Sequence, residues 1–459
     1  MFDISSIVEI IATTNIFSTI LYYCFYGLLI SLVFASLGIS VGIRKVYVQL
    51  LLKIFEFGKQ RIDSELLNKN NDKDECDAND DEEDNRNESV NQSVYGDCSI
   101  IQNDICDTLL DTLLVEKKPF HFIDICDDIK KGVQAIIDDE VTKRFDTQEL
   151  ASWNLLTRTN KKYTHLSLRL AIFWGFGCLI RYFILFPTRI IVTIISIAML
   201  IFCTATIGCL PDGLYKRQIY WHACLVCFRI MTRAFSGIIT FHDRQNMAKP
   251  GGITVANHTS PIDVAILASD NCYALVGQRQ GGLLGMLQGA LQRASNHIWF
   301  ERFELRDRQL VTLRLKEHVN HPDNLPILIF PEGTCINNSA VMMFKKGSFE
   351  LNSVVYPIAI KYDPKFGDPF WNSSKHGYMY YLMMMMTSWA IVCDVWYLPP
   401  MRKLPNEDAV QFANRVKSEI ANKGGLVDLQ WDGQLKRMNV KGEWKEKMQH
   451  EFSKKIKIT

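Results

Sequence analysis

Two residues in one short segment have the side chains needed for proton transfer. His258 and Asp263 bracket a polar turn in GGITVANHTSPIDVAIL and are separated by four residues. That spacing lets the chain bend and bring the carboxylate to one imidazole nitrogen, so that the other nitrogen can accept a hydroxyl proton near neutral pH. The same turn could instead start a helix, with Ser260 as N-cap and Pro261 in the first helical position. This segment alone leaves both interpretations open.

Two later segments add candidate substrate-binding groups. HIWFER is expected to be a short strand that ends in Arg302, whose planar charged fork suits either a phosphate or a surface salt bridge. PILIFPEGTC is expected to be a buried strand followed by a turn at Glu332, Gly333 and Thr334. Glycine permits close backbone approach there, and the following amides could stabilise an anion or a developing oxyanion. An ordinary strand-ending turn would have the same sequence.

Two further segments complete the set of motifs. FKKGSFE places Lys345 and Lys346 near the same region, although paired lysines are commonly only solvated. VVYPIAI is expected to be a third strand, and it contains Pro357. The chain contains no GxSxG segment, so a hydrolase with a nucleophile elbow is disfavoured.

The order of these motifs resembles a known signature. NHTSPID, WFER, FPEGTC and VYPIAI follow one another as the four blocks of the glycerolipid acyltransferase family do. The flanking segments MMFKKGSFE, FGDPFWNSS and SWAIVCDVWYLPPM are similar to those of the endoplasmic-reticulum glycerol-3-phosphate acyltransferases, and the resemblance runs from about Glu149 to about Lys441. The chain departs from the commoner form at Asn296 and Trp299, where Gly and Phe often stand, and at Cys335, where many lysophospholipid acyltransferases have Arg.

This resemblance implies a fold and a set of roles. The fold is an α/β acyltransferase domain with a central mixed sheet flanked by helices, plus N-terminal transmembrane or hairpin helices. His258 would be the catalytic base, with Asp263 supporting it. Acyl-CoA would be the co-substrate, with no cofactor and no metal. The residues implied for substrate binding are Arg302, Glu332 and Gly333 for the glycerol phosphate and Pro357 for the acyl part, to which the turn and the lysine pair add Thr334 and Lys346.

The predicted reaction moves an acyl group from acyl-CoA to the sn-1 hydroxyl of glycerol 3-phosphate and makes lysophosphatidic acid. One alternative is acylation of lysophosphatidic acid at sn-2, which would use the same base and phosphate site. A second is a non-catalytic membrane scaffold, which would explain the apolar segments but leave four ordered motifs unexplained. Replacement of His258 separates a scaffold from a transferase.

Residues 1–45 are predicted to form a membrane anchor. The chain carries no charge from Ile10 to Ile43, which is long enough for an apolar helix to cross a bilayer. The positive-inside rule places the end of this segment in the cytosol. Residues 46–165 are then expected to be a variable cytosolic segment with an acidic, disordered linker at about 70–95. The basic residues after the anchor are Arg44, Lys45, Lys53, Lys59 and Arg61.

A second apolar block, from Leu170 to Leu210, is interrupted by Arg181, Pro187 and Arg189. It predicts a membrane helical hairpin over 166–211, either fully spanning or re-entrant. The remaining boundaries are a membrane-surface or buried docking helix at 212–245, a catalytic core at 246–400 and a helical tail at 401–459. The late run YYLMMMMTSWAIVCDVWYL is expected to face the membrane, line the acyl site or lie in the core.

Composition restricts partners and compartment. The formal net charge of +1 disfavours a nucleic-acid partner, and thirteen scattered cysteines indicate a reducing environment. The ending KIKIT resembles a dilysine retrieval signal, or is only a basic tail. The predicted partners are acyl-CoA, glycerol 3-phosphate and membrane lipid. The predicted location is the endoplasmic reticulum membrane, multi-pass, with the catalytic domain facing the cytosol and lipid droplets as a second site.

Overall fold

The computed structural model describes residues 19, 22–23, 26–39, 42–77, 143–148, 168–300, 305–351 and 353–436. The chain divides into one unit of Met1–Gly58 with Val141–Thr459 and a second unit of Lys59–Glu140. Most of the predicted anchor, residues 78–95 of the predicted acidic linker and the KIKIT ending lie outside the described residues. Residues 70–77 of that linker instead form the end of a helix, α2 (Ile43–Asp77).

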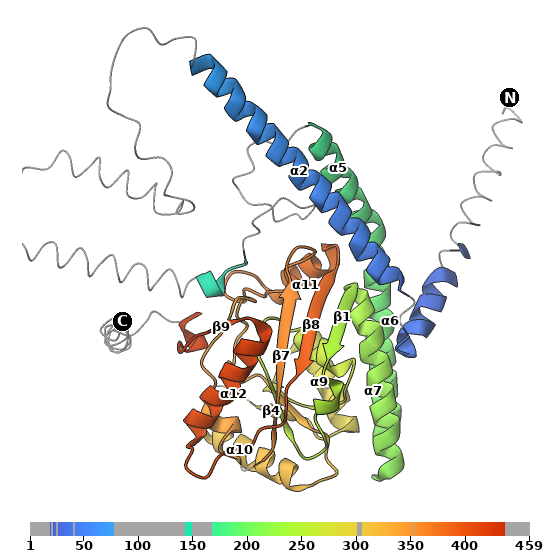
Figure 1. The fold of residues 1–459 in the computed structure, drawn as a ribbon. Coiled ribbons are helices and arrows are strands. Elements are labelled where there is room, and N and C mark those ends of the chain that lie inside the picture. Colours follow the sequence, from blue (N-terminus) through green and yellow to red (C-terminus); the bar gives the residue numbers. More distant parts are fainter. Residues whose placement is uncertain are drawn as a thin grey trace, which may run out of the picture. The chain divides into compact units, whose positions relative to one another are not determined.

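A seven-stranded mixed sheet forms the centre of the first unit, in the order β1-β8-β7-β2-β5-β3-β4 (Figure 1). Neighbouring strands are parallel except for the antiparallel pair β7 and β8. The mixed central sheet expected from the sequence is therefore confirmed. Its strands are β1 (Gly237–His242), β2 (Ile253–Ala256), β3 (Ala274–Gln278), β4 (Ile298–Phe300), β5 (Ile327–Ile329), β7 (Val355–Asp363) and β8 (Ile391–Tyr397).

Helices cover both faces of this sheet. Helices α6, α7, α8, α9 and α11 lie over one face, and α10 and α12 lie over the other. Because both faces are covered, a central strand such as β2 can be apolar and buried at every position, as ITVA is. The helices are α6 (Phe186–Gly208), α7 (Leu214–Ala234), α8 (Asp263–Ala268), α9 (Gly282–Ala294), α10 (Leu305–Asn320), α11 (Tyr378–Thr387) and α12 (Ala409–Gly424).

Shorter elements connect these layers. A two-stranded parallel pair joins β6 (Ala340–Val341) to β9 (Val427–Asp428). Asp408 and Gln411 form a capping box at the start of α12, and Gly425 ends that helix at φ 59°. The 3₁₀ turns are Lys143–Phe145, Arg244–Asn246, Lys346–Ser348 and Gly433–Lys436.

The predicted helical hairpin over 166–211 is wrong. Helix α5 (Leu168–Leu179), a π-helical turn (Ile180–Leu185) and α6 form one continuous helix of 41 residues. Pro187 does not break it, because proline is tolerated in the first turn of α6 and the π-helical turn before it accommodates the missing hydrogen bond. Among the described residues, this is the one helix that is long and apolar enough to cross a membrane.

The boundaries of the catalytic core also differ from those predicted. Strand β1 lies within 212–245 but belongs to the sheet, beside β8. Helix α7 in the same segment packs its buried face between α6 and the sheet, as a docking helix does. Helix α12 lies in the predicted tail, yet its apolar face closes the core under β7. The late apolar run divides into α11, whose Met379, Tyr380 and Met383 are exposed, and the interior strand β8.

Candidate active site

Three neighbouring parallel strands bring distant parts of the chain together. Strand β2 lies between β5 and β7 and is parallel to both, so the carboxyl ends of all three meet at one edge of the sheet. His258 follows β2 by two residues, Cys335 lies on the loop after β5, and Tyr362 is near the end of β7. This edge is where ligands bind in open α/β sheets.

His258 and Asp263 form the hydrogen-bonded pair expected from their spacing. His258 Nδ1 lies 2.9 Å from Asp263 Oδ2. The same oxygen accepts from the backbone N–H groups of Thr259 at 2.8 Å and Ser260 at 2.9 Å, and the hydroxyl of Tyr362 donates to Oδ1. Asp263 is fully buried, and its hydrogen bond to the imidazole favours the tautomer with the proton on Nδ1.

The alternative interpretation of this turn, a Ser260 cap, is not what the structure has. Helix α8 begins at Asp263, its N-cap residue is Ile262, and no side chain caps it. The hydroxyl of Ser260 instead hydrogen-bonds to Tyr381 of α11. The Asp263 carboxylate therefore orders the turn and holds the imidazole at the same time.

The other imidazole nitrogen faces a thiol. Cys335 Sγ lies 3.4 Å from His258 Nε2, and the ring of Phe330 stacks on the imidazole with centroids 4.3 Å apart. The backbone N–H of Ile336 donates to the carbonyl of His258 at 2.9 Å, so the loop after β5 fixes both the main chain and the ring of the histidine.

Opposing effects set the pKa of His258. Burial alone would lower it, but contact with Cys335 and the carboxylate of Asp263 outweigh burial and raise the pKa well above its ordinary value. The imidazole is consequently a strong proton acceptor once neutral, and it is protonated over more of the neutral pH range than an ordinary histidine.

Glu332 is buried and joins the backbone at His258 to the backbone at Met342. Its side chain is 1% exposed, and its two oxygens accept from the backbone N–H groups of His258 at 2.9 Å and Met342 at 3.1 Å. Burial raises its pKa to about 7. Glu332 is absent from the cavity wall, so in this structure it connects two loops instead of pointing at a substrate.

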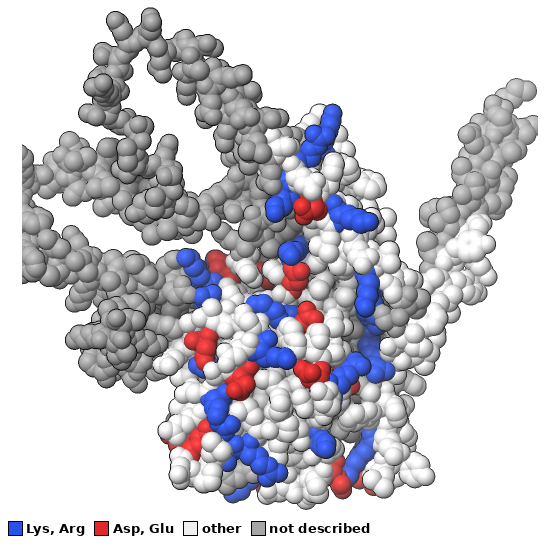
Figure 2. Space-filling model, in the orientation of Figure 1, with Lys and Arg blue, Asp and Glu red and all other residues white. Residues whose placement is uncertain are grey.

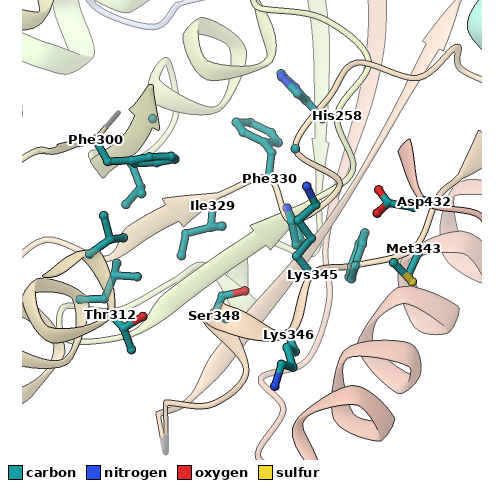
Figure 3. Close-up of a pocket in the computed structure, with 18 of the residues that line it drawn as sticks. His258, Phe300, Thr312, Ile329, Phe330, Met343, Lys345, Lys346, Ser348 and Asp432 are labelled. Atoms are coloured by element: carbon teal, nitrogen blue, oxygen red, sulfur yellow. The ribbon is translucent and has the colours of Figure 1, made fainter. Parts of the chain in front are cut away.

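A cavity of about 960 Å³ opens beside His258 (Figure 3). Figure 3 shows His258 at one end, with Phe330, Ile329 and Phe300 following along one wall and Lys345 and Asp432 across from them. The wall farther from His258 is apolar, with Val276, Val311 and Leu315 beside Phe300. One part of the cavity wall therefore suits a long apolar chain, and another part suits a charged headgroup.

The predicted substrate-binding residues fall into three groups. Gly333, at φ 68°, and Lys346 line the cavity, although the Lys346 ammonium pairs with Glu350 at 3.0 Å. Thr334 and Pro357 do not line it, since Thr334 is half-buried on the loop and Pro357 is buried in β7 beside β2. Arg302 lies outside the described residues, two positions after Phe300.

Several functional contacts were missed in the sequence. Asn257 binds both the N–H and the C=O of Ile360 and so joins the end of β2 to β7. Tyr362 and Tyr381 reach the catalytic turn from 99 and 121 residues away. The only sequence signal was their presence in segments that resemble the family, so no local pattern could have assigned their partners.

A short upstream segment also packs against the active-site loop. The backbone N–H of Asn337 donates to the carbonyl of Arg144 at 3.0 Å, and its side-chain amide donates to the carbonyls of Lys143 and Asp146 at 2.6 and 3.1 Å. Asn372 donates to the carbonyl of Phe145. Residues 143–148, called the docked segment below, are thus bound through their backbone.

Within the described ranges, no three His, Cys, Asp or Glu side chains converge as metal ligands.

The chain is similar to known acyltransferases. A family model described as Acyltransferase matches residues 238–361. Glycerol-3-phosphate acyltransferase 4 of Homo sapiens is 52% identical over 425 residues, which cover 92% of this chain and 91% of that protein.

Two more relatives extend this comparison. Glycerol-3-phosphate acyltransferase 3 of Homo sapiens is 49% identical over 421 residues, covering 91% of this chain and 92% of that protein. The crystal structure of the 1-acyl-sn-glycerophosphate acyltransferase PlsC from Thermotoga maritima aligns with a TM-score of 0.41 at 15% identity, over 59% of this chain and 99% of that one.

Proposed function

Because the chain belongs to the glycerol-3-phosphate acyltransferase family, we propose that it transfers an acyl group from acyl-CoA to the sn-1 hydroxyl of glycerol 3-phosphate. The products are lysophosphatidic acid and CoA. The observation that carries this proposal is the His258–Asp263 pair, whose second imidazole nitrogen is directed at the cavity loop.

His258 Nε2 accepts the proton of the acceptor hydroxyl as that oxygen attacks the thioester carbonyl. Asp263 holds Nδ1–H and stabilises the imidazolium that forms. Backbone amides after Gly333 are the proposed donors to the oxyanion of the tetrahedral intermediate. When that intermediate collapses, CoA leaves as a thiolate and takes the proton from the imidazolium, which restores the neutral base.

The shape of the cavity supports an assignment of its two ends. We assign the acyl chain to the apolar wall around Phe300 and Leu315, where burial of methylene groups is favourable. Lys345 and Lys346 supply positive charge for phosphate groups of either substrate, and Arg302 remains a predicted phosphate ligand. Both substrates then meet at His258, which reduces the entropic cost of bringing hydroxyl and thioester together.

The chain is proposed to act at a membrane. The helix Leu168–Gly208 packs one face on the catalytic unit and leaves Ile191, Ile194 and Phe202 exposed on the other. Passage of the chain through the membrane more than once, by the predicted N-terminal anchor and this helix, stays a proposal. Endoplasmic reticulum, a cytosolic catalytic side and lipid droplets remain proposals, which imaging of the full chain with and without the KIKIT ending would test.

Acyl transfer by the full-length protein in vesicles tests the function. Labelled acyl-CoA is offered with glycerol 3-phosphate or with lysophosphatidic acid. We expect turnover of glycerol 3-phosphate, and a fall on the order of 10³-fold in His258→Ala, because the base is lost. His321→Ala removes an exposed histidine far from the cavity wall and should retain activity.

The outcomes separate the alternatives. Turnover of lysophosphatidic acid alone would assign the sn-2 reaction instead. No turnover of either acceptor by a folded protein would favour the scaffold. Turnover that persists in His258→Ala would show that His258 is not the catalytic base. If His258→Ala unfolds at the same temperature as the wild type, its loss of activity is due to the missing base and not to misfolding.

A further inference from the structure

Arg181 is a charged residue inside the long apolar helix, and the proposed reaction does not use it. It lies in the π-helical turn between α5 and α6, and its side chain is fully buried. Its guanidinium carbon lies 5.4 Å from the ring centre of Trp389 and 5.9 Å from that of Tyr182. π-Helical turns are frequent at functional sites, and an ionisable residue in such a helix usually marks one.

The guanidinium of Arg181 lacks acceptors. Among the described residues, its Nε and Nη1 atoms have no hydrogen-bond partner, and its Nη2 donates only to the thiol of Cys178 at 3.3 Å. Within the part of the chain that the structure describes, no carboxylate pairs with it. Sulfur is a weak acceptor, and aromatic rings attract the charge without satisfying the N–H groups. A buried guanidinium in this state is costly unless an anion accompanies it.

A second buried guanidinium, that of Arg189, adds another positive charge to the same region. Arg189 lies two helical turns further along and donates to the carbonyls of Met386 at 2.7 Å, Ser388 at 2.5 Å and Trp389 at 2.8 Å. Its remaining N–H groups bind the hydroxyl of Ser236. Arg189 is thus satisfied by neutral groups and ties α6 to the end of α11, and it contributes a positive charge that no carboxylate balances.

The surroundings indicate where an anion would come from. Phe183 and Ile184, next to Arg181 in the chain, are 75% and 60% exposed, as expected of a helix surface in contact with lipid. On α2, the hydroxyl of Tyr47 donates to the carbonyl of Trp389 at 3.1 Å. Burial raises the pKa of this hydroxyl, and the positive charges of Arg189 and Arg181 oppose that rise. The charge therefore lies where α2 and the long helix meet, beside an apolar surface.

We propose that Arg181 binds the phosphate of an anionic membrane lipid, which enters between α2 and the π-helical turn. Nε and Nη1 form the fork that can donate to two phosphate oxygens in one plane. The acyl chains would lie along the exposed apolar face at Phe183 and Ile184. Arg181 is covered in this structure, so α2 moves aside when the lipid binds.

The test measures thermal unfolding of the delipidated, full-length protein in detergent. Phosphatidylglycerol is added as the anionic lipid, phosphatidylcholine as the neutral one and inorganic phosphate as the free anion. We expect phosphatidylglycerol to raise the unfolding midpoint on the order of 5 °C and the other two to have little effect. In Arg181→Met, which keeps a long apolar side chain, the shift should disappear.

Two further variants keep the result interpretable. Arg169→Met removes an exposed cation from the same helix and should keep the full shift, which excludes a general charge effect. Arg181→Lys retains the positive charge but not the planar fork, so it should keep only part of the shift in the unfolding midpoint. This variant provides the test if Arg181→Met does not fold. An equal shift in wild type and both Arg181 variants, or an equal shift with phosphatidylcholine or with phosphate, would overturn the proposal.

Discussion

The catalytic histidine is held by groups from helix α8, from the loop after β5 and from strand β7. Asp263 fixes one ring nitrogen, Cys335 contacts the other, and Phe330 lies against the face of the ring. Behind them, Glu332 holds the backbone of the histidine, and Tyr362 holds Asp263. Each contact restricts the imidazole, so little reorganisation remains for the step in which the proton moves.

Cys335→Ala should shift the pH dependence of activity. The contact with Cys335 helps to raise the pKa of His258, so its removal lowers that pKa and the neutral base forms at lower pH. The acidic limb of kcat/KM should move to lower pH. The phosphate of glycerol 3-phosphate also titrates at about pH 6. Its effect on the pH profile is the same for variant and wild type, so it does not affect the difference between them.

A control accompanies this prediction. Cys335→Ser retains a hydrogen-bonding group at the same place and should move the limb less than alanine does. An acidic limb that stays in place in Cys335→Ala would show that the thiol does not influence the base.

Glu332→Gln should destabilise the fold more than it weakens substrate binding. A glutamine has one acceptor oxygen, so it cannot accept from the backbone N–H groups of both His258 and Met342. We expect the free energy of unfolding to fall by about 1–3 kcal/mol, as for a buried donor left unpaired. KM for glycerol 3-phosphate should change little, because Glu332 is absent from the cavity wall.

Glu350→Gln is the matched control for this variant. It makes the same substitution at a half-exposed carboxylate paired with Lys346 and should change stability by less than about 0.5 kcal/mol. A raised KM with unchanged stability in Glu332→Gln would return Glu332 to the phosphate-binding role that the family resemblance implies.

The sequence predicts the parts of this site that are local. His258 and Asp263 are five residues apart, and a turn suffices to join them, so their pairing could be foreseen. Tyr362 and Asn257 act across strands, and their partners depend on the order β7-β2-β5, which no local pattern reveals. The place of Glu332 beside the catalytic turn could be foreseen, but its hydrogen bonds to two backbone N–H groups could not, because spacing does not show which way a side chain points.

Among the elements, the docked segment at 143–148 has a consequence for the active-site loop. Its backbone carbonyls are bound by Asn337, and the preceding residue, Ile336, donates its N–H to the carbonyl of His258. One tripeptide, Cys335 to Asn337, therefore contacts the catalytic ring, the catalytic backbone and the docked segment in succession.

Asn337→Ala should loosen the docked segment and lower turnover by several-fold. The alanine removes two side-chain hydrogen bonds to the carbonyls of Lys143 and Asp146, so hydrogen exchange in 143–148 and in the loop at 335–339 should rise. Asn422→Ala, at an exposed position of α12, serves as the control. Unchanged exchange in both segments would contradict this coupling.

The strands were predicted more accurately than the long helix. Runs such as ITVA and VVYPIAI are short, apolar and bounded by turn residues, which indicates buried strands. Arg181, Pro187 and Arg189 interrupt the apolar run and so predict a turn between two helices. The structure buries both arginines against the domain and places the proline in a first turn, so the interruption is in polarity and not in the backbone path.

The surface of the described residues carries both charged and apolar side chains. Lys, Arg, Asp and Glu are interspersed over the face drawn in Figure 2. Exposed apolar side chains are concentrated on the helix Leu168–Gly208, on α2 and on α11, which contact one another. A helix of 41 residues is about 60 Å long, about twice the hydrocarbon thickness of a bilayer, so it cannot lie within that layer along the membrane normal over its full length.

Ile194→Lys should reduce membrane binding. Ile194 is 61% exposed on the face of α6 that turns away from the domain, and a lysine there would cost about 3 kcal/mol in hydrocarbon. Vesicle flotation should show an increase in unbound protein of about 10- to 100-fold. Asn422→Lys adds the same charge to α12 and should bind as wild type does. Equal flotation of both variants would show that this face does not contact lipid.

The hydrogen bonds of Arg189 also bear on how the protein is made. Its carbonyl partners at Met386, Ser388 and Trp389 are 197 to 200 residues further along the chain. Strand β1 likewise pairs with a distant strand, β8, since Gly237 lies opposite Ile391. At about 5–20 residues per second, a ribosome needs roughly 10–40 s to supply them. During that interval the nascent chain exposes an unpaired guanidinium and an unpaired strand edge, so the newly made protein depends on chaperones or the translocation machinery until β8 emerges.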